Sequence, residues 1–154
     1  MKKSTKFIIA LLVTVGALAI TYRVVNQAPS KDLAADAQMQ EIITSGGCLQ
    51  CHSGSPDLPF YANWPVASGM VQKDVTQGYR AFDMTEMAEA LKAGKPVGKV
   101  ALAKVEKVIM DGTMPKHAYY MVHWGSSVTD AKKEMAMALS LIHISEPTRL
   151  RCIS

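Results

Sequence analysis

The chain has 154 residues with 17 Lys+Arg and 13 Asp+Glu, so its formal net charge at neutral pH is +4. The excess of positive charge lies at the two ends, because residues 31–140 contain 11 Lys+Arg and 12 Asp+Glu, which gives −1. A folded part without net positive charge argues against a nucleic-acid-binding protein. No nucleic-acid partner is therefore expected, and the length suits one compact domain.

The N-terminal segment has the pattern of an export signal. Three lysines within the first six residues precede the apolar run 7–20, and this order predicts that the remainder is translocated. Cleavage near Ala17-Leu18-Ala19 would release a signal peptide. Retention would leave an anchor, although the run is short for a span of about 20 residues. We therefore predict a signal peptide or signal anchor over residues 1–26 and a periplasmic location, free or anchored to the inner membrane.

Helices are predicted after this segment in chain order. Residues 27–31 have the composition of a short linker, and Ser30 is a good N-cap for a helix from Lys31 to Ser45, with Leu33, Ala37 and Ile43 on one face. The other predicted helices have apolar residues three and four positions apart. The first of these helices follows Pro65 and contains Val66, Met70, Val71, Val75 and Tyr79. The second covers residues 85–92 and is stopped by Gly94, and the third covers residues 97–111 and is stopped by Gly112. The last helix begins after Thr129.

The sequence Cys48-Leu49-Gln50-Cys51-His52 is a C-x-x-C-H motif, the pattern that attaches a c-type haem covalently. Two thiols at this spacing can each add to one vinyl group of the same porphyrin, and the imidazole of the next residue can bind the iron. A thiol oxidoreductase would need a βαβ frame, and a zinc site would need a second cysteine pair. Neither is found in the sequence. We therefore predict one covalently attached haem c.

The predicted fold class is all-α, because no stretch alternates polar and apolar residues over the length of a strand. Residues 32–140 are expected to form a compact, cytochrome c-like helical domain around the haem. A chain segment of this size builds only a modest core, so a large apolar cofactor would supply much of the buried surface. The apo chain is expected to fold poorly.

The C-terminal segment 141–154 departs from these patterns. The apolar period is lost after about Ser140, and Pro147 would break a continuing helix. The segment is similar to the translation of a sequencing adapter, so we predict an artefactual or disordered tail and exclude His143 and Cys152 from any site.

The second axial ligand decides what the haem does, because a strong ligand makes an electron carrier and an open position permits peroxide or oxygen chemistry. The candidates are Met110, Met114, His117 and His123. Met114 directly follows a helix stop, and Pro115 disfavours helix there, so its side chain can be directed out of a loop. We favour Met114, although a chain with ten methionines has many in its core. His123 and His117 are the alternatives.

Five segments of the sequence occur in a particular order and spacing. They are Cys48-Leu49-Gln50-Cys51-His52, Pro59-Phe60-Tyr61-Ala62-Asn63 with Pro65-Val66, Asp74-Val75 with Gly78, Phe82-Asp83-Met84, and Gly112-x-Met114-Pro115 with Tyr119 or Tyr120 and His123. Together they resemble the small haem-binding domain family of bacterial c-type cytochromes, over about Ile42 to Ala138. In that family the domain occurs alone behind an export signal and at the N-terminus of dihaem cytochrome c peroxidases.

The resemblance also implies roles for individual residues. Cys48 and Cys51 would carry the thioether links, His52 would be the proximal ligand and Met114 the distal one. Tyr61 and the tyrosine near His123 would line the pocket.

The expected function is electron transfer by a mono-haem cytochrome outside the cytoplasm, without catalytic residues of its own. Its partner would be a redox protein, such as a dihaem peroxidase or a respiratory donor, and a membrane would be contacted through the N-terminal segment if that is uncleaved. The alternative is a haem peroxidase, with His117 or His123 as acid–base group, or a gas or redox sensor with an open iron site.

Overall fold

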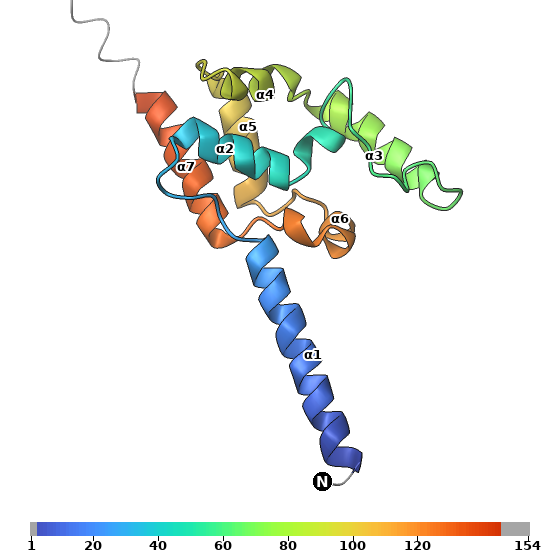
Figure 1. Ribbon diagram of the computed structural model, residues 1–154. Helices are drawn as coiled ribbons and strands as arrows, with labels where there is room; N and C mark the ends of the chain where they lie inside the picture. Colours follow the sequence, from blue (N-terminus) through green and yellow to red (C-terminus); the bar gives the residue numbers. More distant parts are fainter. Residues whose placement is uncertain (1–2, 146–154) are drawn as a thin grey trace, which may run out of the picture.

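The computed structural model describes residues 3–145, and within this range the chain forms seven α-helices, two short 3₁₀ helices and no strand (Figure 1). The prediction of an all-α fold is confirmed. The elements in chain order are α1 (Lys3–Val25), α2 (Ala35–Ser45), η1 (Cys48–Gln50), α3 (Ser68–Ala81), α4 (Thr85–Lys92), α5 (Lys99–Met110), α6 (His117–Val122), η2 (Trp124–Ser126) and α7 (Asp130–Ser145).

The hydrophobic core lies between α2, α4, α5 and α7. Helix α7 packs against α2 and α5, and α4 packs against α2. On α5, residues at spacings of three and four place one apolar face toward the core. The buried core residues are Met39, Ile43, Met84, Met87, Leu91, Val97, Leu102, Val105, Ile109, Ala136 and Leu139.

Two polar contacts connect α7 to its surroundings. Lys132 is buried at 2 % exposure, and its Nζ donates a hydrogen bond of 3.1 Å to the carbonyl of Ser127. Burial lowers the pKa of the Lys132 ammonium. Ser140 Oγ donates to a carboxylate oxygen of Glu106 at 2.5 Å, which links α7 to α5. Buried polar groups of this kind are stable only when paired, so these contacts fix how α7 is seated.

The predicted bounds are closest for α4 and α5, each followed by a glycine, and for the start of α7. The observed bounds of α4 equal the predicted range 85–92, α5 differs from its predicted range by two residues at one end and one at the other, and α7 begins directly after Thr129. Gly94 and Gly112 follow α4 and α5 with φ of 61° and 65°, a left-handed conformation that glycine adopts without strain. The glycine stops therefore act as the sequence indicates.

The predicted start of the first domain helix is wrong. Helix α2 begins at Ala35, and Ser30 does not cap it. Instead the side-chain amide of Gln38 donates to the carbonyls of Ser30 and Leu33 at 3.2 and 3.0 Å, which holds residues 30–33 as a turn before the helix. Leu33 is consequently exposed, whereas Ile43 is in the core as expected.

Two other elements differ from the prediction. The helix predicted after Pro65 is present as α3, but it starts only at Ser68, and Val66, Met70 and Tyr79 of its apolar pattern are exposed. Helix α6 was not predicted. Helix α7 continues to Ser145, past the predicted domain end at residue 140, and the rest of the predicted tail, 146–154, lies outside the described residues.

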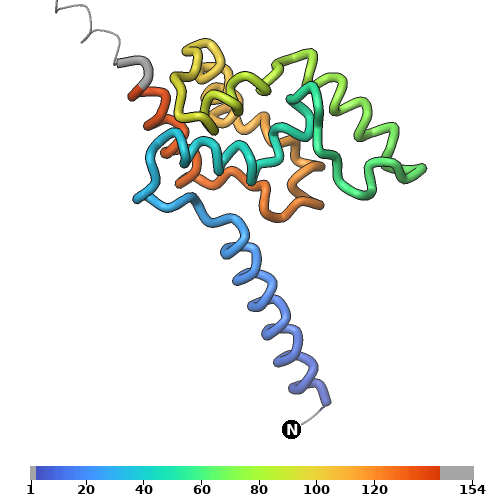
Figure 2. The backbone as a smooth tube through the Cα atoms, turned by 45° about the horizontal axis from the view of Figure 1, so that its top comes forward, coloured from blue at the N-terminus to red at the C-terminus, as the bar shows by residue number. Residues whose placement is uncertain are grey.

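Helix α1 leaves the domain as a separate rod, as Figures 1 and 2 show from two directions. Within the described range it is the one helix long and apolar enough to cross a membrane. None of its residues is buried. Its apolar run is therefore not explained by burial inside the described domain.

Truncation of a core residue should lower the stability of this domain. We expect Leu102→Ala to reduce the free energy of unfolding by about 2–5 kcal/mol, because it removes a fully buried side chain and leaves a cavity. The control is Val100→Ala on the same helix, which is exposed. It should change the free energy by about 0.5 kcal/mol or less. Urea unfolding of the full chain, followed by circular dichroism, measures both, and equal effects would contradict the described core.

Candidate functional site

The C-x-x-C-H segment forms a tight turn directly after α2. Gly47 adopts a φ of 67° and reverses the chain, and the N–H groups of Cys51 and His52 then both donate to the carbonyl of Cys48, at 3.2 and 3.0 Å. Positions separated by three and four residues share one side of a helical turn. The two sulfur atoms and the imidazole are thereby carried by one turn of backbone.

The His52 ring is oriented by a carbonyl from a distant part of the chain. Its Nδ1 lies 2.8 Å from the carbonyl oxygen of Phe82, which can only accept a hydrogen bond. Nδ1 must therefore carry the proton, and Nε2 keeps its lone pair. A backbone carbonyl bound to one ring nitrogen is the usual support of a metal-binding histidine. The arrangement leaves His52 Nε2 suited to bind an iron atom.

The two thiols are neither bonded to one another nor activated. Cys48 and Cys51 form no disulfide in the described chain. Burial raises the pKa of Cys48 to about 11, and burial, followed by the charge of Asp74, raises the pKa of Cys51. A thiol oxidoreductase needs the opposite shift, toward a thiolate at neutral pH. The surroundings of this motif therefore speak against thiol–disulfide exchange.

Helix α3 passes close to the motif at Gly78. A Cβ atom at this position would lie 2.5 Å from the carbonyl oxygen of Cys51, which is closer than side-chain atoms come to backbone. Only glycine allows this approach without displacement. Elsewhere in the described structure α3 makes no extensive contact with another helix. The contact at Gly78 therefore sets where α3 lies relative to the motif.

Tyr119 on α6 covers the other side of the motif. Its hydroxyl donates a 2.7 Å hydrogen bond to Gln50 Oε1, and a Cβ on Gly47 would lie only 2.0 Å from that hydroxyl. Burial raises the pKa of Tyr119 to about 12, so the hydroxyl stays protonated and donates. Its ring also stacks on His123, with centroids 3.9 Å apart. Helix α6 is thus attached directly to the C-x-x-C-H turn.

Both ring nitrogens of His123 are occupied by protein partners. Nδ1 donates to the carbonyl of Tyr119 at 2.9 Å, and Nε2 accepts from the hydroxyl of Tyr61 at 2.7 Å. Burial raises the pKa of Tyr61, which keeps it a donor. The structure therefore brings Tyr61, Tyr119 and His123 together beside the motif. Binding of iron by His123 would require that the bond from Tyr61 is given up.

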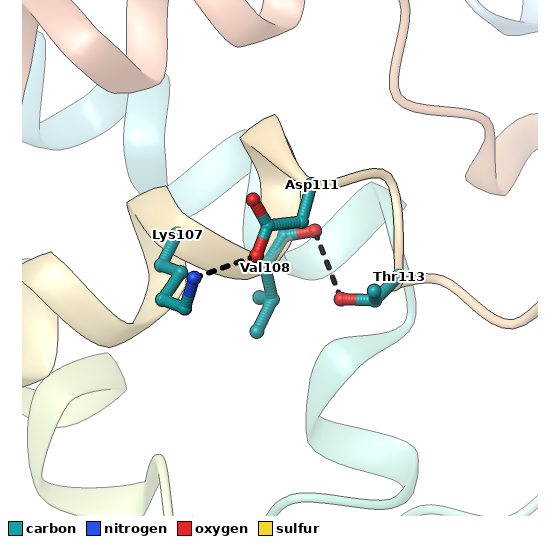
Figure 3. A network of polar contacts seen from close by, with 4 residues as sticks. All are labelled: Lys107, Val108, Asp111 and Thr113. Carbon is teal, nitrogen blue, oxygen red and sulfur yellow. Dashed lines mark hydrogen bonds and ion pairs between the residues drawn. The ribbon is translucent and has the colours of Figure 1, made fainter.

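Met114 is half-buried in the loop between α5 and α6, and both ends of this loop are held. At the first end, Thr113 Oγ1 donates to the carbonyl of Val108 at 3.3 Å, next to the ion pair of Lys107 with Asp111 (Figure 3). At the other end, Lys116 Nζ lies 2.6 Å from Asp74 Oδ1 on α3.

This ion pair connects the Met114 loop to the haem motif. Both Asp74 and Lys116 act on the thiol of Cys51, because the carboxylate raises its pKa and the ammonium lowers it. The Met114 loop is therefore held to α3, the helix that approaches Cys51 at Gly78. The other candidates differ from Met114: Met110 is exposed at the end of α5, and His117 is exposed and packs against Tyr120 at 4.7 Å between ring centroids.

The residues around the motif fit a haem. One turn supplies two thiols and an imidazole with its Nε2 lone pair available. The segment leading into α3 carries large apolar side chains that protein atoms leave uncovered, as a surface for an apolar porphyrin requires. These are Phe60, Trp64 and Val66, and Met70 in the first turn of α3 is exposed as well.

The sequence indicated the C-x-x-C-H motif, Tyr61 and a tyrosine near His123 as site residues, but it did not predict the groups that bind these side chains. Phe82 contributes only a carbonyl group, which no side-chain pattern indicates. The pairs Asp74–Lys116 and Gln50–Tyr119 are separated by 42 and 69 positions. A local motif carries no signal for contacts at such separations.

Gly78→Ala should disturb the motif more than the fold of α3 itself. The new Cβ must push α3 away from Cys51, so we expect a clear loss of bound haem per chain and a destabilisation of about 1–3 kcal/mol. Gly69→Ala is the matched control on the same helix, because a Cβ there meets nothing within 4 Å. It should keep haem and raise stability slightly through helix propensity. Haem absorbance per protein measures the effect, and equal loading of the two variants would contradict the close approach.

Comparisons with known proteins show the family of this chain. The sequence model of the haem-binding domain family matches residues 7–140. A stretch of 92 residues is 36 % identical to cytochrome c peroxidase Ccp of Escherichia coli (strain K12), and the match covers 60 % of this chain but 20 % of that relative. No solved structure matches significantly. The family match extends over most of the chain, including the C-x-x-C-H turn, α3 and the Met114 loop, and the chain therefore belongs to the haem-binding domain family.

Proposed function

We propose that this chain is a mono-haem c-type cytochrome domain that transfers electrons outside the cytoplasm. The observation that carries the proposal is the His52 ring, whose Nδ1 is held by the Phe82 carbonyl at 2.8 Å on the same backbone turn as two unpaired thiols. A redox use of the cysteines would not need this histidine to be oriented, and among the described residues no group of three His, Cys, Asp or Glu side chains is arranged to hold a metal ion such as zinc. A haem held by its vinyl groups and its iron needs all three residues.

Each cysteine has a separate task in this proposal. Cys48 and Cys51 would each hold the porphyrin by one thioether link, formed when the S–H adds across a vinyl double bond, with sulfur on one carbon and hydrogen on the other. No oxidant is consumed. His52 would bind the iron through Nε2, and the Phe82 carbonyl would keep its ring from rotating. A bound haem supplies a one-electron couple at its iron.

Met114 is the proposed distal ligand. Its loop is held to α5 by Thr113 and to α3 by Lys116, so the methionine can be kept at one place beside the motif. His123 is less suited, because Nε2 already accepts a 2.7 Å hydrogen bond from Tyr61. Tyr61 and His123 would instead line the pocket and hold the segment before α3 against α6. A thioether ligand favours the ferrous state and suits an electron carrier.

The proposed location is based on helix α1, and the proposed partner is based on the similar protein of E. coli. Helix α1 would direct the domain out of the cytoplasm into the periplasm and could stay as an anchor in the inner membrane. The similar E. coli protein is named a cytochrome c peroxidase, and the chain matches only a fifth of it. We therefore propose that peroxide reduction belongs to a partner protein and that this domain passes electrons within such a system.

Removal of a motif cysteine should weaken the covalent retention of haem. Cys48→Ala and Cys51→Ala each remove one proposed link, and the double variant removes both, so haem staining on a denaturing gel should fall in the singles and vanish in the double variant. Cys152→Ala is the control and should stain like the parent, because Cys152 is outside the proposed site. Equal staining of the double variant and the parent would rule out covalent attachment.

Replacement of the proposed distal ligand should open the iron. Met114→Ala should lower the reduction potential and allow carbon monoxide to bind, because the thioether no longer stabilises the ferrous iron or occupies its sixth position. Met110→Ala, which changes a methionine of the preceding helix, should leave both properties unchanged. Potentiometry and visible spectra in the presence of carbon monoxide measure them.

The same spectra separate the alternatives. If His123 were the ligand, His123→Ala would produce the opening and Met114→Ala would not. A parent protein that already binds carbon monoxide readily and turns over peroxide would contradict the electron-carrier proposal and favour an enzyme or a gas sensor.

A further inference from the structure

Helix α1 is connected to the domain by hydrogen bonds of Asn26, and we call this connection the joint. Asn26, the residue after α1, is 3 % exposed. Its Nδ2 donates to the carbonyl of Tyr22 at 2.9 Å and also to the carbonyl of Trp124, and its Oδ1 accepts from the N–H of Ser127 at 3.0 Å. One buried amide thus binds the last turn of α1 and both ends of η2. A signal segment that only awaits removal needs no such contacts.

A second layer of contacts strengthens this joint. The hydroxyls of Tyr22 and Ser127 share a hydrogen bond of 2.8 Å, and the Tyr22 ring meets the Trp124 ring edge-on at 6.4 Å between centroids. The carbonyl of Ser127 in turn accepts from the buried Lys132 at the start of α7. The contacts therefore continue from α1 through η2 into the core. Together they hold α1 and the domain in one orientation.

The position of Tyr22 on α1 indicates its depth in a bilayer. Helix α1 has 23 residues, a length of about 34 Å at 1.5 Å per residue, close to the roughly 30 Å hydrocarbon thickness of a membrane. Tyr22 and Arg23 lie at its outer end, where aromatic and basic side chains belong at the membrane–water interface. Because the ring centroids of Tyr22 and Trp124 are 6.4 Å apart, a bilayer that α1 crosses would have Trp124 close to its interface as well.

Three apolar residues of α6 and η2 lie at or near the contact between Tyr22 and Trp124 in the sequence. We call them the α6–η2 patch: Met121, Val122 and Trp124. All three side chains are exposed. Figures 1 and 2 both show α6 and the following turn on the side of the domain from which α1 leaves. Residues 116–127 contain no acidic residue, and Lys116 is paired with Asp74, so this segment itself would not repel anionic headgroups.

We propose that the α6–η2 patch rests in the interfacial layer of the same phospholipid bilayer that α1 crosses, and that Asn26 holds the domain in this orientation. The inference rests on the proposed membrane location of α1, not on the haem. His123 directly precedes η2, so the haem site would be kept next to the membrane surface. A redox partner would then have to approach along that surface.

The test compares two valines with the same exposure. Val122 in the patch and Val100 on α5 are both 71 % exposed. Each is changed to cysteine in a Cys152→Ser background of the haem-loaded full chain, which is reconstituted in vesicles of phosphatidylethanolamine and phosphatidylglycerol. The rate of labelling by a membrane-impermeant maleimide is then measured for outward-facing molecules, after subtraction of the background variant.

We expect Val122→Cys to react about tenfold more slowly than Val100→Cys, because a side chain sunk about 5–10 Å into the headgroup layer is reached only when the domain lifts away. Addition of Asn26→Ala should bring the two rates together while the protein stays in the membrane fraction. Equal rates in the parent would overturn the contact with the bilayer, and slow labelling that persists in the Asn26→Ala variant would overturn the role of the joint.

Two further readouts keep this inference separate from the proposed function. An isolated protein whose N-terminus begins beyond Val25 would overturn the inference, since α1 would be absent. Haem absorbance of the same samples reports the cytochrome proposal independently. One outcome is that the chain takes up no haem when it is expressed with a haem-attachment system, while its Val122→Cys variant is still labelled slowly. That result would contradict the proposed function and still support the membrane contact.

Discussion

The hydrogen bond between His52 Nδ1 and the carbonyl of Phe82 connects the motif to the rest of the molecule. Phe82 ends α3, and two residues later the N–H of Met84 donates to the carbonyl of His52 at 2.7 Å. Met84 itself is buried in the core at 4 % exposure. The orientation of the imidazole is therefore set by the packed helices and not by the motif alone. Any change that loosens the core around α4 should also loosen His52.

The segments that enclose the motif are attached to it one by one. Gly78 brings α3 against Cys51, Tyr119 brings α6 against Gln50, and Lys116 ties the Met114 loop to Asp74. These contacts leave large apolar side chains before α3 uncovered. A porphyrin would cover such side chains and add the apolar burial that the small helical core lacks. Its binding would therefore contribute to folding as well as to electron transfer.

The sequence predicted those features that depend on neighbouring residues. Helices α4, α5 and α7 start or end close to the predicted positions because glycine stops and an apolar period act locally. The start of α2 was wrong because Gln38 binds the carbonyls of Ser30 and Leu33, a contact that propensity does not contain. The apolar spacing after Pro65 predicted the helix α3, yet Val66 before it and Met70 within it are exposed. Periodicity shows an apolar face but not what covers it.

In the candidate site, too, the sequence predicted local features but not the contacts between distant residues. The motif is contiguous, so its chemistry could be inferred from spacing. The bond between Tyr61 and His123 spans 62 positions and was not predicted, since the family resemblance implied only that Tyr61 lines the pocket. The joint at Asn26 gave no sequence signal, because a single asparagine after an apolar helix is common. Long-range hydrogen bonds of this kind decide how the domain stands relative to α1, and only the folded structure displays them.

The most direct measurement of the proposed cofactor attachment is the intact mass of the protein, expressed with a haem-attachment system and denatured before analysis. Two thioether links survive unfolding, whereas the coordination of iron by His52 and Met114 does not. The chain should therefore carry the added mass of one haem after denaturation. A denatured chain with the mass of the polypeptide alone would contradict covalent attachment at Cys48 and Cys51.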